Sequence, residues 1–218
     1  MPIYRKYSEQ ISWKLFWQKQ EKWGELVISN ITRRVIVEIS GENLLLSKIS
    51  INDLDFISRI ETDENLWYFE EYVESDKNVV YEEYIQKIEG EENQTSYDFI
   101  VTIVTDKNKT PIGLAQLWND SEYRKSWEIG FAILPEYGGK GYGSEAAKML
   151  LKFAFEKLDA HKVFGMCNSK NTRSAALMEH IGMRREAIFK EELFWHNKWF
   201  DQYYFSILER EYFVGTKP

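Results

Sequence analysis

Cysteine and histidine are scarce in this 218-residue chain, and their scarcity argues against two kinds of chemistry. The single cysteine, Cys167, cannot form an intrachain disulfide, so we expect a reducing compartment, most simply the cytoplasm. One cysteine also excludes a zinc cluster of the CxxC type, and the three histidines (His161, His180 and His196) have no metal-ligand spacing. The sequence therefore predicts no metal, and at Cys167 it predicts a small core residue instead of an activated nucleophile.

Long apolar runs and a net positive charge are also missing. No stretch has the length and apolar character of a membrane-spanning helix, and the start MPIYRKYSEQ lacks the apolar region of a secretory signal. The net charge of −7 argues against nonspecific nucleic-acid binding and favours cationic partners. With 44% hydrophobic and 29% charged residues, the composition is that of a soluble globular protein, for which we expect neither nucleic acid nor membrane as a partner.

The stretch around which the chain is organised is WEIGFAILPEYGGKGYGSEAA, residues 127–147. An apolar run with strand character ends at Pro135, and a glycine cluster and a helical pattern follow it. Glycines suit a loop that binds an anion, because they adopt positive φ and leave no Cβ in the way of a ligand. This arrangement, in which a glycine turn joins a strand to the start of a helix, often binds an anion, usually a phosphate. The backbone N–H groups of the turn and the positive end of the helix dipole both point at the anion.

The spacing of the glycines excludes the two common nucleotide-binding motifs. A P-loop needs GxxxxGK[ST], which does not occur here. A Rossmann fingerprint needs GxGxxG, whereas Gly139, Gly141 and Gly143 give GxGxG. Taken alone, the loop also fits an ordinary strand-to-helix turn, so the flanking sequence has to decide.

From Asn43 onward the hydrophobic pattern predicts one α+β domain around a mainly antiparallel sheet. The expected order is strand, two helices, three strands, helix, strand, helix and two strands, which makes about seven strands and about four helices. The domain is placed at residues 43–214. Strands are expected at about 44–49, 97–104, 111–118, 129–134, 162–167, 185–194 and 199–208, and helices at about 53–60, 80–88, 144–158 and 172–181.

Residues 1–42 form an extension whose pattern is ambiguous. Residues 11–17 fit either a strand or one side of a helix, whereas Val35, Val37 and Ile39 alternate more cleanly and predict a strand that ends at residues 41–43. The extension either adds packing to the main domain or forms a dimer or substrate surface with its tryptophans. A homodimer is therefore one of the expected assemblies.

Gly141 and Gly143 match the acetyl-CoA pyrophosphate loop of the GNAT acyltransferases, which reads Gln or Arg, two residues, Gly, one residue, Gly or Ala. Two later blocks resemble the branch that contains the ribosomal-protein alanine and serine N-acetyltransferases. They are NTRSAALMEHIGMRREA and KEELFWHNKWFDQYYFSILEREY, the second with Asp201 before the last strand. The resemblance covers about residues 43–212. It implies the GNAT fold and an acetyl-CoA-dependent N-acetyltransferase that acts by direct attack of a primary amine in a ternary complex.

The resemblance also implies the cofactor contacts. In this family, backbone groups of the strand before the loop bind pantetheine and polarise the thioester, and the loop N–H groups bind the pyrophosphate. Asn171 matches the family's Asn that orients pantetheine, although a helix cap would also explain it. Gly138 stands where the family has Gln or Arg, which removes one side-chain contact, and Lys140 either adds charge or is a solvated lysine. By position the contacts are Phe131, Ala132 and Ile133 in the strand, and Gly138, Gly139, Lys140, Gly141, Tyr142, Gly143 and Ser144 in the loop.

Two residues are the candidates for proton transfer. Glu128 lies where many relatives place the carboxylate that takes the amine proton through water; the alternative is a polar strand residue that pairs with Arg124 or Lys125. Ser174 is a candidate proton donor to the departing thiolate, or a CoA contact. Many relatives have a tyrosine as the acid where this chain has Met178, so direct proton return by solvent is the alternative.

The acceptor is expected to be a protein N-terminus or a small amine. The stretch Phe69-Glu-Glu-Tyr72 is similar to one in spermidine acetyltransferases, and carboxylates clustered with aromatic residues suit a polycation. Glu70 and Glu71 are therefore the candidate acceptor residues, with an exposed helix end and core aromatics as the alternative. A polyamine or aminoglycoside acetyltransferase is the second hypothesis, and a catalytically silent acyl-CoA-binding protein, motivated by Gly138 and Met178, is the third.

Overall fold

In the computed structural model, which describes residues 38–90 and 95–215, one sheet has the strand order β1-β2-β3-β4-β5-β6-β8-β7. Neighbouring strands are antiparallel except β5 and β6, which are parallel. The strands are β1 (Glu38–Ser40), β2 (Leu44–Lys48), β3 (Ser96–Ile103), β4 (Pro111–Ser121), β5 (Ser126–Ile133), β6 (Lys162–Asn168), β7 (Arg184–Trp195) and β8 (Lys198–Leu208).

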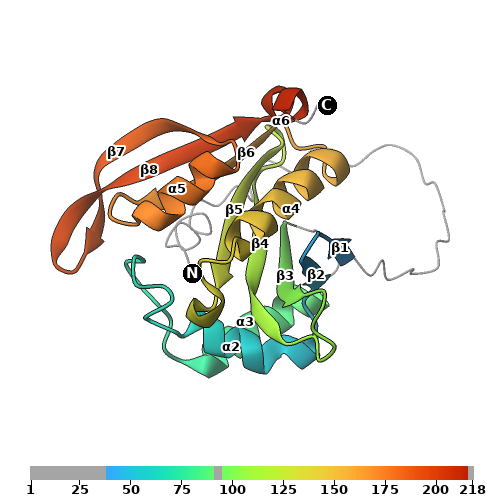
Figure 1. The fold of residues 1–218 in the computed structure, drawn as a ribbon. Helices are drawn as coiled ribbons and strands as arrows, with labels where there is room; N and C mark the ends of the chain where they lie inside the picture. The colour runs from blue at the N-terminus through green and yellow to red at the C-terminus, as the bar shows by residue number, and fades with distance from the viewer. Residues whose placement is uncertain (1–37, 91–94, 216–218) are drawn as a thin grey trace, which may run out of the picture.

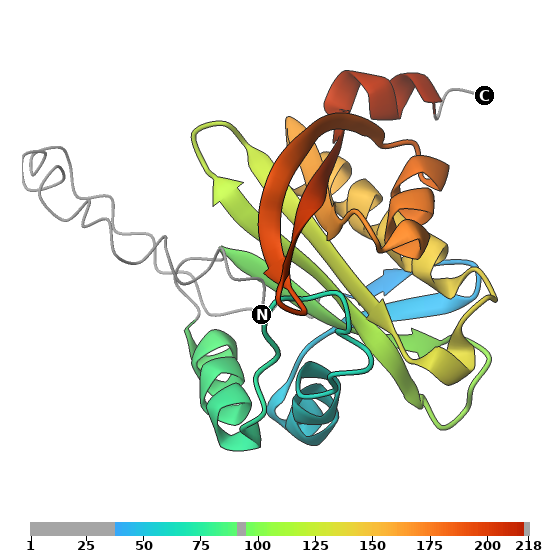
Figure 2. The ribbon, with the colours of Figure 1, turned by 90° about the vertical axis from the view of Figure 1, so that its left-hand side faces the viewer.

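Helices cover both faces of this sheet (Figures 1 and 2). On one face lie α4 (Tyr142–Lys157) and α5 (Thr172–His180), and on the other lie α2 (Leu54–Glu61) and α3 (Lys77–Glu89). Short 3-10 turns, η2 (Ile51–Asp53) and η3 (Pro135–Tyr137), precede α2 and α4, and α6 (Glu209–Gly215) follows β8. None of the helices in the described part of the chain is long and apolar enough to cross a membrane.

Strand β3 shows how the sequence divides the core between the two faces. Successive side chains of a strand point to opposite faces. Phe99 and Val101 accordingly pack with the buried side of α4, which includes Leu150, whereas Ile100 packs with Ile57 of α2. All five are 2% exposed or less, so the sheet is covered on both sides and holds its shape around the site.

The central feature of the sheet is the point where β5 and β6 part. Strand β5 pairs with β4 along its whole length, from Ser126 to Ile133. With β6 it shares only three pairs, of which the last is Glu128 with Phe164. Beyond that point β6 continues on β8 alone, so residues 129–133 of β5 lose their neighbour on that side and a cleft opens.

The C-terminal hairpin of β7 and β8 turns at His196 and Asn197, where a turn was predicted. Both residues have positive φ, 48° and 59°, as in a two-residue hairpin turn whose twist matches that of the strands. The hairpin extends away from the main body of the sheet (Figure 1). Its tip reaches the segment that follows α2, as the contacts below show.

The predicted order of elements from Asn43 onward is confirmed, and helix α6, which follows the last predicted strand, was not predicted. Strand β1 lies within the strand predicted to end at residues 41–43. It pairs with β2, which makes the sheet eight-stranded instead of about seven-stranded and lets it begin before residue 43. Of the residues that predicted a strand near the N-terminus, Ile39 lies in β1; Val35, Val37 and the ambiguous pattern of residues 11–17 lie outside the described residues.

Candidate functional site

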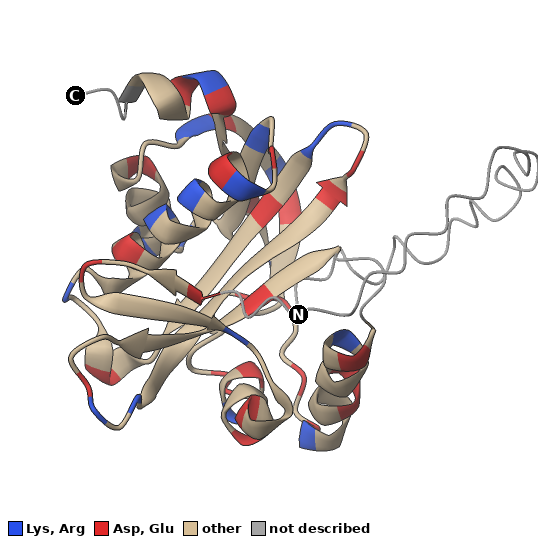
Figure 3. Cartoon of the chain, turned by 90° about the vertical axis from the view of Figure 1, so that its right-hand side faces the viewer, with Lys and Arg blue, Asp and Glu red and all other residues tan. Residues whose placement is uncertain are grey.

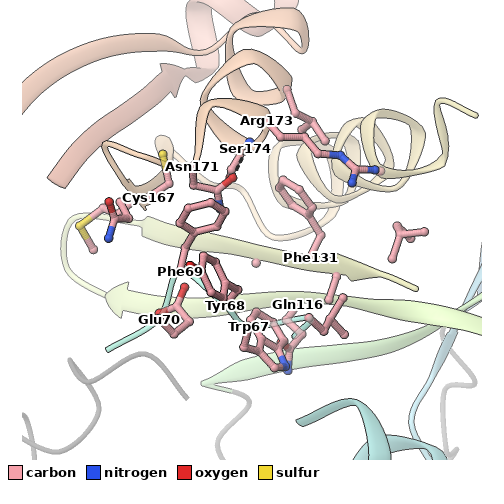
Figure 4. A pocket seen from close by; sticks show the side chains of 18 of the residues that line it. Trp67, Tyr68, Phe69, Glu70, Gln116, Phe131, Cys167, Asn171, Arg173 and Ser174 are labelled. Carbon is pink, nitrogen blue, oxygen red and sulfur yellow. Dashed lines mark hydrogen bonds between the residues drawn. The ribbon is translucent and has the colours of Figure 1, made fainter. Parts of the chain in front are cut away.

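A cleft of about 1150 Å³ follows the opening between β5 and β6. The glycine loop and Arg173 lie toward one end, and Glu70 and Cys167 lie toward the other, with Phe131 between them (Figure 4). The cleft brings together the predicted site residues from β5, the loop, α5 and the segment after α2; Lys140 is the exception and does not line it. The predicted residues that line it are Glu70, Glu71, Glu128, Phe131, Ala132, Ile133, Gly138, Gly139, Gly141, Tyr142, Gly143, Ser144, Asn171 and Ser174.

The glycine loop has the geometry of an anion nest. Gly139 and Gly141 have φ of 75° and 84°, and no atom lies within 4 Å of the place where a Cβ would stand on either. Glu145 donates its N–H to Gly141 O (3.0 Å) in the first turn of α4. The N–H groups of residues 142–144 precede that bond and have no acceptor within the helix, so they are directed at whatever occupies the loop.

Strand β5 presents backbone to the same cleft. Phe131, Ala132 and Ile133 are in register with β4, where Ile133 pairs with Gly113. In an antiparallel pair, alternate residues direct N–H and C=O to the partner strand, and the residues between them direct these groups away from it. On β5 the outward groups face the opening that β6 has left, which is where an extended ligand arm can bind them.

Glu128 lies at the fork of the sheet, the point where β5 and β6 part. Burial, followed by the charges of Asp120 and Glu70, raises its pKa from 4.5 to about 7. The sequence also allowed an ion pair of Glu128 with Lys125 or Arg124, and this ion pair is not present. Lys125 pairs with Asp159, and no ion pair among the described residues includes Glu128. A carboxylate with a pKa near 7 at the edge of a cleft can accept a proton at neutral pH.

Two further carboxylates lie in this end of the cleft. Glu61 is 8% exposed, and burial raises its pKa. The hydrogen bond that Tyr84 Oη donates to Glu61 Oε1 (2.6 Å) lowers this pKa by a smaller amount. Glu70 is open to the cleft, yet the surrounding walls desolvate it, and this together with the charges of Glu71 and Glu61 raises its pKa. Figure 3 shows acidic residues on helices and strands across this side of the molecule.

The segment after α2 is tied to the tip of the β7–β8 hairpin. Glu71 Oε1 accepts the N–H of Phe194 (2.5 Å), and Trp195 Nε1 donates to Tyr68 O (2.7 Å). The ring of Phe69 lies 5.5 Å from that of Trp195. The segment is therefore a turn-rich wall of the cleft, held by the hairpin, and the carboxylate of Glu71 already has a backbone partner.

A comparison with known protein families identifies the family of this chain. The acetyltransferase (GNAT) domain model matches residues 43–184. The chain belongs to the GNAT acetyltransferase family. GNAT acetyltransferases use acetyl-CoA as the co-substrate, which agrees with open space at the glycine loop and with a strand that is unpaired on one side next to it.

Individual relatives agree with this family assignment. The uncharacterized N-acetyltransferase YnaD of Bacillus subtilis is 41% identical over 87 residues, which cover 40% of this chain and 51% of YnaD, so the chain spans about half the length of that relative. The spermidine N(1)-acetyltransferase of Vibrio cholerae is 28% identical over 79% of this chain and 96% of its own length. The crystal structure of a GNAT acetyltransferase from Bacillus anthracis superposes with a TM-score of 0.68 at 29% identity, covering 80% of this chain and 99% of its own.

The start of α5 brings two more predicted site residues, Asn171 and Ser174, to the cleft. Asn171 Oδ1 accepts the N–H of Ser174 (3.0 Å), so the predicted helix cap is present and the side-chain NH₂ of Asn171 is left for a ligand. Ser174 lies against Cys167, whose pKa burial raises to about 12, so the thiol is protonated at neutral pH. Met178, 2% exposed, offers no proton where many GNAT relatives have a tyrosine.

Trp118, Glu61 and Arg173 are among the cleft residues that were not predicted from the sequence. A Cβ on Gly130 would lie 2.4 Å from Trp118, so the indole of Trp118 covers the backbone of β5 beside Glu128; a glycine inside a strand was the signal for this approach. No sequence pattern could have identified Glu61 as a cleft residue, because it occupies an ordinary position at the end of an amphipathic helix. The same is true of Arg173, because surface arginines are common.

Proposed function

We propose that this chain is an acetyl-CoA-dependent N-acetyltransferase whose acceptor is a primary amine that carries a further positive charge. The observation that supports this most directly is Glu128, a carboxylate with a pKa of about 7 where β5 and β6 part, in one cleft with the glycine loop. From Glu128 to Ile133 the strand runs roughly 17 Å at about 3.4 Å per residue. An extended pantetheine arm along it joins the phosphate nest to the base.

Each residue of the cleft has a role in this proposal. Acetyl-CoA supplies the acetyl group as a thioester. Glu128 takes the proton of the acceptor ammonium, directly or through water, so that the neutral nitrogen can attack the carbonyl carbon. Backbone groups of 131–133 hold the arm and polarise the carbonyl. The new C–N bond forms as the C–S bond breaks, and the nitrogen gives up a second proton to solvent as the amide forms. The departing sulfur takes its proton from Ser174 or from solvent, since Met178 has none to give.

The charge of the cleft supports the acceptor class. Glu61, Glu70 and Glu128 lie at one end, and no ion pair of the described ranges uses any of them. The aromatic side chains of Trp67 and Phe69 also line the cleft. Carboxylates beside aromatic faces in a desolvated site favour an alkyl chain with several ammonium groups. The spermidine acetyltransferase of Vibrio cholerae is a relative with such an acceptor in its name.

A panel of acceptors tests the proposal. Purified protein with acetyl-CoA is assayed for release of CoA with a polyamine, an aminoglycoside, a monoamine of the same length and peptides with free N-termini. We expect the polyamine or aminoglycoside to give the highest kcat/KM. Preference for peptides supports the protein N-terminus as acceptor instead. Binding of acetyl-CoA without turnover of any amine would leave the silent binding protein as the function.

A further inference from the structure

The cleft contains an arginine where the glycine loop lacks a side chain. A Cβ placed on Gly138 would lie 2.7 Å from Nη2 of Arg173 and 3.6 Å from its Cζ. The guanidinium of Arg173 thus occupies the place that a side chain at position 138 would need. In Figure 4 Arg173 extends from α5 along the glycine-loop end of the cleft.

Backbone conformation does not explain the glycine at position 138. Its φ of −65° and ψ of 157° are extended, and any residue adopts them. Gly139 and Gly141, by contrast, have positive φ. The close neighbours of a Cβ at 138 are the Arg173 guanidinium and, at 3.0 Å, the carbonyl oxygen of Pro135. A side chain at position 138 would therefore displace the flexible end of Arg173 and would also lie close against the carbonyl oxygen of the turn.

The surroundings of Arg173 leave its charge uncompensated. It is the second residue of α5, where the positive end of the helix dipole disfavours a cation. It is exposed, and the ion pairs and side-chain hydrogen bonds found within residues 38–90 and 95–215 do not involve it. Lys140, which was expected either to add charge here or to be a solvated lysine, does not line the cleft, and its Nζ lies 5.6 Å from the ring centroid of Tyr137.

We propose that Arg173 supplies from α5 the phosphate contact that the loop lacks at Gly138, with the diphosphate of the coenzyme as its ligand. This inference rests on the proposed cofactor site. A guanidinium presents a planar fork of donors that suits phosphate oxygens, and beside the start of α4 it adds a full charge to a nest built from backbone N–H groups. The Asn171 cap fixes the first turn of α5 and thereby aims the arginine.

Calorimetry with CoA and with dephospho-CoA tests the assignment. Arg173→Ala is expected to weaken both ligands by about ten- to a hundred-fold, the range of a charged hydrogen bond, and Arg173→Lys to recover part of the loss. Arg124→Ala, which removes the same charge at an exposed turn outside the cleft, is the matched control and is expected to bind as the wild type does. A loss confined to CoA would place Arg173 on the 3′-phosphate, and no loss for either ligand would overturn the proposal.

A paired exchange gives a second readout. Gly138→Arg alone is expected to weaken CoA binding, because two guanidinium groups then compete for one place. In the Arg173→Ala background the same Gly138→Arg change is expected to restore binding at least ten-fold, since the loop then carries the side chain itself. Additive losses in the double variant would contradict the inference. If the wild-type protein itself binds no CoA, the proposed function fails, whereas wild-type binding with an unaffected Arg173→Ala variant contradicts only the role of Arg173.

Discussion

Glu128 of β5 and Phe164 of β6 form the last pair that these two strands share. The two strands part at this pair because β6, which follows α4 in the chain, pairs with only the first three residues of β5 and then continues on β8 alone. The backbone of Glu128 is thus paired with Trp118 of β4 and Phe164 of β6, and the residue lines the cleft. A base proposed at this position would be held rigidly and would remain accessible to a substrate.

Substitution in the glycine loop tests the cofactor position. Gly141→Glu introduces a side chain at φ of 84° and a negative charge into the nest. We expect acetyl-CoA binding, which should lie in the micromolar range common for metabolite sites, to be lost in calorimetry. The melting temperature serves as the control for folding. Undiminished binding by a folded variant would place the cofactor elsewhere.

Asn171 has two roles that two variants can separate. Asn171→Ala removes the cap on Ser174 N and is expected to cost about 1 kcal/mol of stability in urea unfolding. Asn171→Asp keeps an oxygen for the cap but loses the NH₂ group, so it should unfold as the wild type does while binding acetyl-CoA more weakly. Equal affinity of Asn171→Asp and wild type would reduce Asn171 to a helix cap.

Glu70 and Glu71 are adjacent and are expected to behave differently. Glu70→Gln removes charge from the acceptor end, so KM should rise several-fold for a polyamine and hardly change for a monoamine. Glu71→Ala frees the N–H of Phe194 and loosens the hairpin tip, so it should lower the melting temperature and impair all acceptors alike. Equal effects of Glu70→Gln on both amines would remove the argument from charge.

The sequence predicted the elements around the site better than the site itself. The glycine pattern and the helical stripe of α4 are local signals, and they predicted the nest within one continuous segment. The raised pKa of Glu128 could not be predicted in this way, because it arises from burial and from Asp120 and Glu70, which other parts of the chain bring near. The same holds for Arg173, which meets Gly138 only after α5 has packed beside α4.

The raised pKa of Glu128 also predicts how stability varies with pH. The folded state holds this proton up to about pH 7, whereas an unfolded glutamate loses it near 4.5, so ionisation costs stability as pH rises through that window. Glu128→Gln removes this cost. We expect the variant to match the wild type near pH 4 and to be more stable at pH 8, by about 3 kcal/mol at most. Urea unfolding at both pH values measures the difference, and a constant offset would contradict the shifted pKa.

The same residue has the opposite effect on activity. An alkyl ammonium has a pKa of roughly 10.4, so nearly every acceptor arrives protonated at neutral pH and cannot attack until it loses a proton. In the wild type, kcat/KM should rise with pH through about 7 as Glu128 ionises.

Glu128→Gln keeps the shape of the side chain and removes the base, so kcat/KM at pH 7.5 should fall by about 10²–10⁴-fold while acetyl-CoA affinity stays the same. The step near pH 7 should vanish and activity should recover as free amine accumulates at higher pH. A variant that keeps full activity and the step would assign base catalysis to another group. Glu70 is then the next carboxylate to test, because it lies in the same end of the cleft and its charge acts on Glu128.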